Sequence, residues 1–124
     1  MANRWRRLRR AAQELSAEPS DEELHMIRIS AKRCRYAAEA AAQVCGRNAR
    51  QFAGAVADIQ QVLGDHQDTV VAEAWLRAAA KAIPSVGLVA GVAISEEQAQ
   101  RARHRAEFAS AWAKTERKSR SWLD

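Results

Sequence analysis

Alanine content is the feature that most narrows the folds open to this chain. The 124 residues include 28 alanines, with only two prolines, four tryptophans, two phenylalanines and one tyrosine. Alanine is the strongest helix former, whereas strands are enriched in β-branched and aromatic residues. We therefore predict an all-α fold, an up-and-down antiparallel bundle of about four to five long helices. A chain of this length is expected to form one domain.

Capping and breaking residues predict where the first helices begin and end. Residues 1–19 form a basic helix or a frayed arm that Pro19 interrupts. Ser20 and Glu23 have the spacing of a capping box, so a long helix is expected to start there and to end at Gly46. This second segment opens the main helical domain, residues 20–124, within a single domain overall of about residues 5–120.

The remaining segments are also predicted to be helical. A helix over residues 48–63 is expected to stop at Gly64, and another to start at Asp65 or His66 and run to Pro84. Residues 85–94 predict a short buried helix, and a second capping box at residues 95–98 predicts the start of a last helix that runs towards Trp122.

Helical periodicity also predicts which side chains are buried. Trp75 and Trp112 lie on apolar helix faces and are expected in the core. Cys34 and Cys45 are too far apart on one helix for a disulfide, so we expect two buried, reduced thiols. In contrast, we expect four basic residues of the last helix to be ordinary solvated side chains: Arg101, Arg103, His104 and Arg105.

The segment 25–36 carries a concentration of cations without an acidic residue. At about 100° per residue, His25, Arg28, Lys32 and Arg35 fall in one narrow sector along roughly 15 Å of helix, with Tyr36 beside them. Another sector of the same helix is apolar and can be buried. Solvated helix faces usually mix charge signs, so this stripe predicts an anion-binding surface, and its length suits a polyanion.

The total charge agrees with such a partner. Twenty Lys and Arg residues against fifteen Asp and Glu give a net charge of +5, and Arg is the main cation. Arginine forms forked hydrogen bonds with phosphate oxygens. Cysteine and histidine spacings do not predict a metal site, and no cofactor is expected. No signal peptide or membrane-spanning stretch is predicted, so we expect a cytoplasmic protein.

Two motifs resemble those of the CHAD domain, the conserved-histidine α-helical domain. The first is Leu24-His25-x-x-Arg28-x-x-x-Lys32-Arg33-x-Arg35-Tyr36, and the second covers residues 63–70, Leu-Gly-Asp-His-Gln-Asp-Thr-Val. A complete CHAD domain contains two helical halves that face each other, and this chain is similar to the C-terminal half. The resemblance implies one half of a CHAD-type double bundle, which pairs with a second copy or with another CHAD half.

The resemblance also implies non-catalytic binding of inorganic polyphosphate, in association with polyphosphate granules. The implied ligands are His25, Arg28, Lys32, Arg33 and Arg35. The implied supporting positions are Tyr36, Asp65, His66 and Asp68. Arg7 and Arg10 belong to an N-terminal cluster that either extends the anion surface or forms a disordered tail. For His66 and its neighbouring acids, the simpler interpretation is a helix cap, and the alternative is a histidine oriented by a carboxylate.

Three other functions are compatible with parts of the sequence. Non-specific nucleic-acid binding fits the charge, although the stripe offers no base-reading Asn or Gln. A phosphoanhydride hydrolase or phosphotransfer accessory would use His25 or His66, although the acids lie mostly at helix ends and not beside the stripe. A structural helical partner would pair through apolar faces. We predict a binding module and not an enzyme.

Overall fold

The computed structural model describes residues 1–123 as an assembly of α-helices without strands. Helix α1 spans Ala2–Gln13, α2 spans Asp21–Cys45, α3 spans Arg47–Ala82 and α4 spans Gly87–Trp122; a short 3₁₀ turn, η1, spans Pro84–Val86. The predicted all-α class is therefore confirmed. Residue 124, the last of the predicted main domain, lies outside the described residues.

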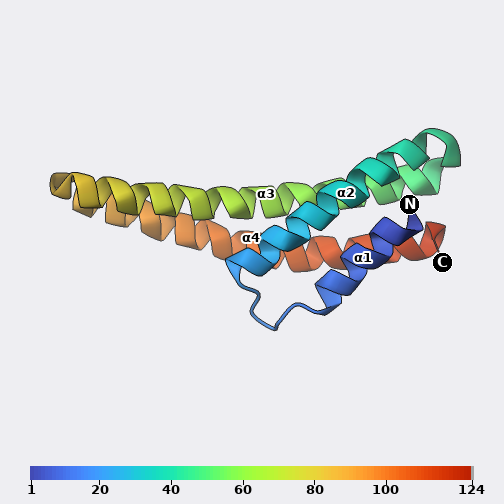
Figure 1. Cartoon of the computed structure of the whole chain (residues 1–124), viewed down its shortest axis with the longest axis horizontal. Coiled ribbons are helices and arrows are strands. Elements are labelled where there is room, and N and C mark those ends of the chain that lie inside the picture. The colour runs from blue at the N-terminus through green and yellow to red at the C-terminus, as the bar shows by residue number, and fades with distance from the viewer. Residues whose placement is uncertain (124) are drawn as a thin grey trace.

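The four helices cover two unequal regions (Figure 1). Helices α3 and α4 form one long antiparallel hairpin, while α1 and α2 cover only the half of it that contains both chain termini. We call residues 70–100 the distal hairpin and the remaining described residues the body. The body is the multi-helix part of the molecule, and the distal hairpin projects from it as two helices connected by η1.

The core lies in the body and receives side chains from all four helices. Its buried members include Trp5 and Leu8 of α1, Leu24, Ile27, Ala31, Cys34 and Ala38 of α2, Phe52, Val56, Ile59 and Leu63 of α3, and Phe108 of α4. Trp5 joins the helices, because its ring lies 5.2 Å from that of Phe52 and 5.4 Å from that of Trp112. The basic N-terminal segment is thus a packed helix, held by its two large apolar side chains.

Both predicted ends of α2 are confirmed. The Ser20 hydroxyl accepts from the amide of Glu23 at 3.1 Å, and the Glu23 carboxylate accepts from the amide of Ser20 at 3.2 Å. The backbone amides of Ser20 and Ser16, which both donate to the Glu23 carboxylate, hold the pKa of Glu23 below its usual value. Gly46 ends the helix with φ of 85°, a conformation that residues with a Cβ rarely adopt.

The predicted break at Gly64 is wrong. Helix α3 runs without interruption through Gly64, Asp65 and His66, so neither acid nor histidine caps a helix. A glycine inside a helix costs about 1 kcal/mol relative to alanine. Packing offsets that cost here, because buried Leu63 and His66 flank the glycine and anchor this stretch of α3 to the body.

The predictions for residues 85–98 are also wrong. Ser95 lies inside α4 and caps nothing, and the predicted short helix over 85–94 is η1 followed by the first two turns of α4. Leu88 and Val89 are 84% and 74% exposed, so this segment is not buried. Helix α4 runs without interruption from Gly87 through this segment, so its backbone needs no cap at Ser95.

Two further burial predictions are corrected. Trp75 is 69% exposed, since no third helix within residues 1–123 covers α3 at that position, whereas Trp112 is half-buried against the core as expected. Cys34 is buried, but Cys45 is exposed at the end of α2. Burial raises the pKa of the Cys34 thiol to about 12, which keeps it protonated and unreactive.

Candidate anion-binding site

Helix α2 presents the basic stripe because another of its faces is fixed in the core. Leu24, Ile27, Ala31, Cys34 and Ala38 are buried. This spacing leaves the cations on the outer side, as the sequence predicted. Lys32, Arg33 and Tyr36 are exposed, whereas His25, Arg28 and Arg35 are half-buried.

Arg28 lies at the centre of the stripe and against α3. Its Nε would lie 3.8 Å from a Cβ built on Gly64, so the side chain passes over the glycine in ordinary contact. That Nε is buried and has no hydrogen-bond partner among residues 1–123. The guanidinium therefore keeps unused donor capacity at the point where α2 meets α3.

Two hollows share Arg28. The outer hollow, of about 350 Å³, is lined by Arg28, Ile29, Lys32, Arg33 and Tyr36. The inner hollow, of about 220 Å³ between α2 and α3, is lined by Arg28, Arg35, Gln60, Gln61, Gly64, Asp65 and Asp68. The structure thus brings Asp65 and Asp68 of the second motif next to two cations of the first.

The charges of the two hollows differ. Three cations line the outer hollow, and its lining among the described residues includes no acid, whereas in the inner hollow two arginines face two aspartates. Carboxylates would repel a phosphate in the inner hollow, at an energy of about 1 kcal/mol for unit charges 4 Å apart even in bulk water. The outer hollow is therefore the better anion site.

Arg35 is held in place by neighbours on both sides. Its Nη1 donates to Gln60 Oε1 at 2.8 Å, and its Nε lies 3.1 Å from Glu39 Oε1 in an ion pair without good hydrogen-bond alignment. Its guanidinium lies 5.2 Å from the centre of the Tyr36 ring, and Lys32 Nζ lies 6.0 Å from that centre. Tyr36 therefore contacts two cations through its ring face.

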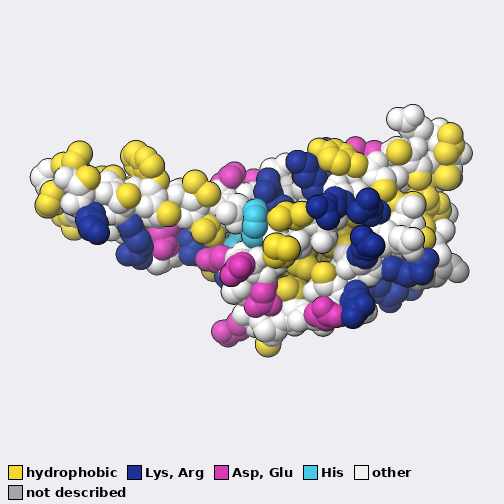
Figure 2. All heavy atoms as spheres, in the orientation of Figure 1, with side chains coloured by type: hydrophobic (Ala, Val, Ile, Leu, Met, Phe, Trp, Pro, Cys, Tyr) yellow, Lys and Arg dark blue, Asp and Glu magenta, His cyan; other side chains and the backbone are white. Residues whose placement is uncertain are grey.

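His25 lies at the N-terminal end of the stripe and Arg7 and Arg10 lie on α1. The Nδ1 of His25 is buried and has no hydrogen-bond partner among residues 1–123. Arg7 is exposed, and Arg10 pairs with Glu14 at 3.0 Å. Figure 2 shows Lys and Arg side chains gathered over α2 and α1 on the same side of the body.

His66 lies in the interior and not on the basic stripe. Only 2% of the residue is exposed, and its Nε2 lies 3.3 Å from Asp21 Oδ1. Burial lowers the pKa of His66, nearby Asp21 acts in the opposite direction, and Arg105 and Arg101 lower it further. The histidine is thus a buried, carboxylate-facing group, which corrects its interpretation as a cap.

A cluster of polar contacts around Asp21 was missed by the sequence analysis. Arg105 donates from Nη2 to Asp21 Oδ1 at 2.7 Å and from Nη1 to the carbonyl of Pro19 at 2.6 Å. Arg101 donates to Thr69 Oγ1 at 3.1 Å and to Glu73 Oε1 at 3.1 Å. These two arginines are therefore not ordinary solvated residues. We call this set the clasp: Asp21, His66, Thr69, Glu73, Arg101 and Arg105.

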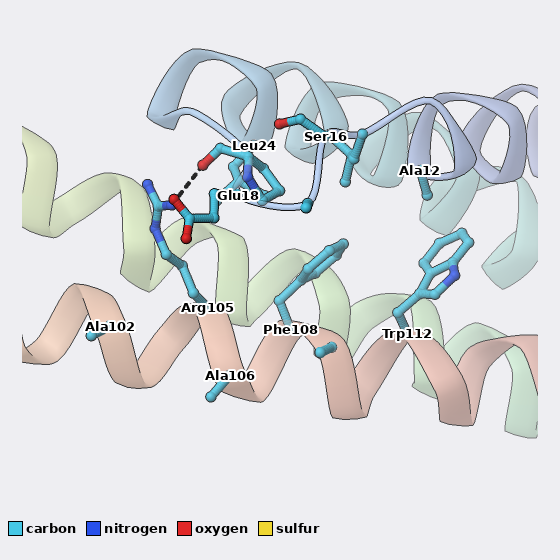
Figure 3. Close-up of a pocket in the computed structure, with 13 residues that line it drawn as sticks. Ala12, Ser16, Glu18, Leu24, Ala102, Arg105, Ala106, Phe108 and Trp112 are labelled. Carbon is cyan, nitrogen blue, oxygen red and sulfur yellow. Dashed lines mark hydrogen bonds between the residues drawn. The ribbon is translucent and has the colours of Figure 1, made fainter.

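The clasp joins the start of α2 to the base of the distal hairpin. Figure 3 shows Arg105 reaching from α4 to the loop that precedes α2. Beside it, Leu15, Leu24, Phe108 and Trp112 contribute to the mainly apolar lining of a cavity of about 700 Å³. Because the Arg105 guanidinium is already bonded, it does not offer this cavity a free anion ligand.

No group of three His, Cys, Asp or Glu side chains in residues 1–123 is placed to hold a metal ion. No helix over the same residues has the length and apolar character needed to cross a membrane.

One of three comparisons with known proteins agrees with the two motifs. Neither curated proteins nor solved structures give a match to this chain. The family model described as the CHAD domain matches residues 1–77, which include α1, α2 and most of α3. That span holds both motifs and more than half of the chain, so the protein belongs to the CHAD domain family.

Proposed function

We propose that the protein binds inorganic polyphosphate, without catalysis, through the outer face of α2. The observation that carries this proposal is the outer hollow, where Arg28, Lys32 and Arg33 converge beside Tyr36. CHAD domains are associated with polyphosphate binding in general, which supports this choice of polyanion. As part of the proposal, the protein acts in the cytoplasm in association with polyphosphate granules.

The mechanism is charge-assisted hydrogen bonding from a rigid support. Capping at Ser20 and the packed apolar face of α2 fix the backbone, so anion binding does not have to order the helix. Tyr36 restrains Lys32 and Arg35 through its ring. Binding releases counterions and weakens as salt rises. His25, Arg35, Arg7 and Arg10 extend the surface for a long chain.

Non-specific nucleic-acid binding is the second candidate, because a basic helix face also attracts a phosphodiester backbone. The outer hollow has one aromatic side chain, Tyr36, and its ring already contacts two cations. Stacking of successive bases, which stabilises single-strand binding, needs free aromatic faces. Polyphosphate has no bases to accommodate and a higher charge density.

A competition experiment tests the proposal. Labelled long-chain polyphosphate is bound at near-physiological salt and challenged with duplex DNA at equal phosphate concentration. The site variant is R28Q/K32Q/R33Q, in which glutamine keeps an unbranched stem and good helix propensity. Its matched control is R103Q/R117Q/R120Q on α4, which removes the same charge from three exposed positions.

We expect the site variant to lose at least tenfold in affinity and the control to change by less than threefold, with DNA displacing little polyphosphate. Equal losses in both variants would mean that only total charge matters, and efficient displacement by DNA would favour the second candidate. Circular dichroism of each variant verifies that α2 remains folded.

A further inference from the structure

The inner hollow between α2 and α3 holds both hydrogen-bond donors and hydrogen-bond acceptors. Arg28 supplies donors, because its Nε is buried and has no hydrogen-bond partner among residues 1–123. Asp65 and Asp68 supply carboxylate oxygens from α3. Apart from Gly64, every residue of the lining carries a polar side chain. A hollow of about 220 Å³ with this lining suits a small polar ligand and not an apolar one.

The two glutamines of the inner hollow add one group of each kind. Gln60 Oε1 accepts from Arg35 Nη1 at 2.8 Å, so the NH₂ group of this amide remains as a further donor. Gln61 Nε2 donates to Asp65 Oδ1 at 3.0 Å, so the Gln61 carbonyl oxygen and Asp65 Oδ2 remain as acceptors. A ligand that satisfies this hollow must therefore accept hydrogen bonds and also donate one.

This requirement disfavours several simple ions. A metal ion or an ammonium group needs acceptors only and would lie beside the guanidinium groups of Arg28 and Arg35. A fully ionised phosphate or sulfate needs donors only and would be repelled by Asp65 and Asp68. A phosphate that keeps a proton satisfies both sets of groups, because its ionised oxygens accept from arginine while its P–OH group donates to a carboxylate.

A retained proton distinguishes the end of a polyphosphate chain from its interior. An internal phosphate shares two oxygens with its neighbours and has a single acidic group, which is ionised at neutral pH. A terminal phosphate has a second ionisation, which for a phosphate ester has a pKa of about 6. A fraction of the chain ends therefore carries a P–OH group near neutral pH, and the internal phosphates do not.

Arg28 connects the inner hollow to the outer hollow, since its side chain lines both. Its Nε lies over Gly64 of α3, 3.8 Å from a Cβ built on that residue. The outer hollow continues from Arg28 to Lys32 and Arg33 on α2. A chain that lies along the outer hollow can therefore place its last phosphate in the inner one.

We propose that the inner hollow binds the protonated terminal phosphate of a polyphosphate chain. Arg28 donates to its ionised oxygens, and Asp68, an exposed residue that lines the hollow, accepts from its P–OH group. The carboxylates determine specificity, because they repel a phosphate without a proton. The assignment to a chain end rests on the proposed function of the outer hollow, whereas recognition of a protonated phosphate does not, since free orthophosphate offers the same chemistry.

Orthophosphate and sulfate are matched probes of this site, because at pH 8 both are mainly dianions and only orthophosphate carries a proton. Amide chemical shifts of residues 60–68 follow their binding to the full chain. We expect the wild type to bind orthophosphate at least tenfold more tightly than sulfate, and Asp68→Asn to reduce this preference at least threefold. Asp58→Asn is the matched control, since Asp58 is exposed on α3 outside the hollow, and it should keep the preference.

A second pair of probes separates chain ends from chain interiors. Linear tripolyphosphate has two terminal phosphates, whereas cyclic trimetaphosphate has the same number of phosphates and no end. We expect tripolyphosphate, and not trimetaphosphate, to shift the amides of residues 60–68. Equal binding of orthophosphate and sulfate, a preference unchanged in Asp68→Asn, or equal shifts from the linear and the cyclic probe would overturn the proposal.

A variant of the outer hollow alone distinguishes this proposal from the proposed function. K32Q/R33Q alters two residues that line the outer hollow and not the inner one. We expect it to weaken the binding of long-chain polyphosphate and to leave the binding of orthophosphate unchanged. Long-chain binding that survives in K32Q/R33Q would contradict the proposed function, and the preference for orthophosphate over sulfate would still test the inner hollow.

Discussion

The body and the distal hairpin are built from the same two long helices and yet differ in what they bury. In the body, α1 and α2 cover α3 and α4, and Phe52, Ile59 and Leu63 are buried in a core shared by four helices. In the distal hairpin the same helices continue without cover, and Trp75 and Leu88 are exposed. Helix propensity is thus sufficient for the secondary structure of both regions, but burial depends on the number of helices that meet.

The two regions also differ in net charge. Residues 70–100 hold two cations, Arg77 and Lys81, and three acids, Glu73, Glu96 and Glu97. The net positive charge therefore lies in the body, where the outer hollow of α2 concentrates three cations. The body provides the proposed anion site, and the distal hairpin exposes large apolar side chains such as Trp75 and Leu88.

The largest expected difference concerns the core. Phe52→Ala should lower the free energy of unfolding by about 3–5 kcal/mol, because a fully buried ring is removed from a packed interior. Leu88→Ala should change it by no more than about 0.5 kcal/mol, since the side chain is mostly exposed. Urea denaturation at 1 µM measures both values. Similar losses for the two variants would show that the hairpin is as tightly packed as the body.

The clasp connects the two regions, and breaking it should have the next largest effect on the free energy of unfolding. Asp21→Asn removes the negative charge that accepts from Arg105 and faces His66, and should destabilise the fold by about 1–3 kcal/mol. Hydrogen exchange should accelerate at the start of α2 and around Thr69. Glu22→Gln is the neighbouring control, exposed and outside the clasp, and should leave exchange unaltered. Faster exchange only in α1 would contradict this role.

The buried His66 of the clasp should make the stability of the fold depend on pH. Since burial lowers the pKa of His66 in the folded state, the unfolded chain binds the proton more readily below about 6.5. The stability that neutral His66 contributes is complete above that pH and is lost as the pH falls through the lowered folded pKa. His66→Asn should flatten this part of the stability profile between pH 7 and 5. A profile that keeps its full slope in the variant would assign the effect to other groups.

The smallest expected effect is a difference in reactivity between the two cysteines of the body. Cys45 is exposed and should react with iodoacetamide at pH 8, whereas Cys34, buried and with its pKa raised to about 12, should not. Mass spectrometry of the native protein should therefore show one modification, located in the peptide that contains Cys45. Two modifications without denaturant would mean that the core opens readily around Cys34.

Local signals predicted the parts of this fold that local interactions determine. The capping box at Ser20, the end of α2 at Gly46 and the buried face of α2 all depend on residues within a few turns of one another. The helix break at Gly64 and the cap at Ser95 were predicted wrongly, because long-range packing between α3 and α4 overrides such signals. Burial of Trp75 was predicted from periodicity, which identifies an apolar face but not whether another helix covers it.

The candidate site likewise combines a local feature, which the sequence predicted, with a long-range feature, which it did not. The basic stripe lies on one helix, so its sequence spacing located it, and the structure added the two hollows that share Arg28. The clasp could not be found in this way, because Arg105 and its partner Asp21 are 84 positions apart. A usable signal did exist in the spacing of Arg101 and Arg105, four residues apart on one helix face, matched by Thr69 and Glu73 on the facing helix.

Amide chemical-shift mapping with long-chain polyphosphate would locate the anion site residue by residue. We expect the largest shifts at Arg28, Lys32, Arg33 and Tyr36, smaller ones at His25 and Arg35, and none across residues 70–100. Shifts centred on the C-terminal cations of α4, or spread over every exposed arginine, would contradict the assignment of the anion site to the outer face of α2.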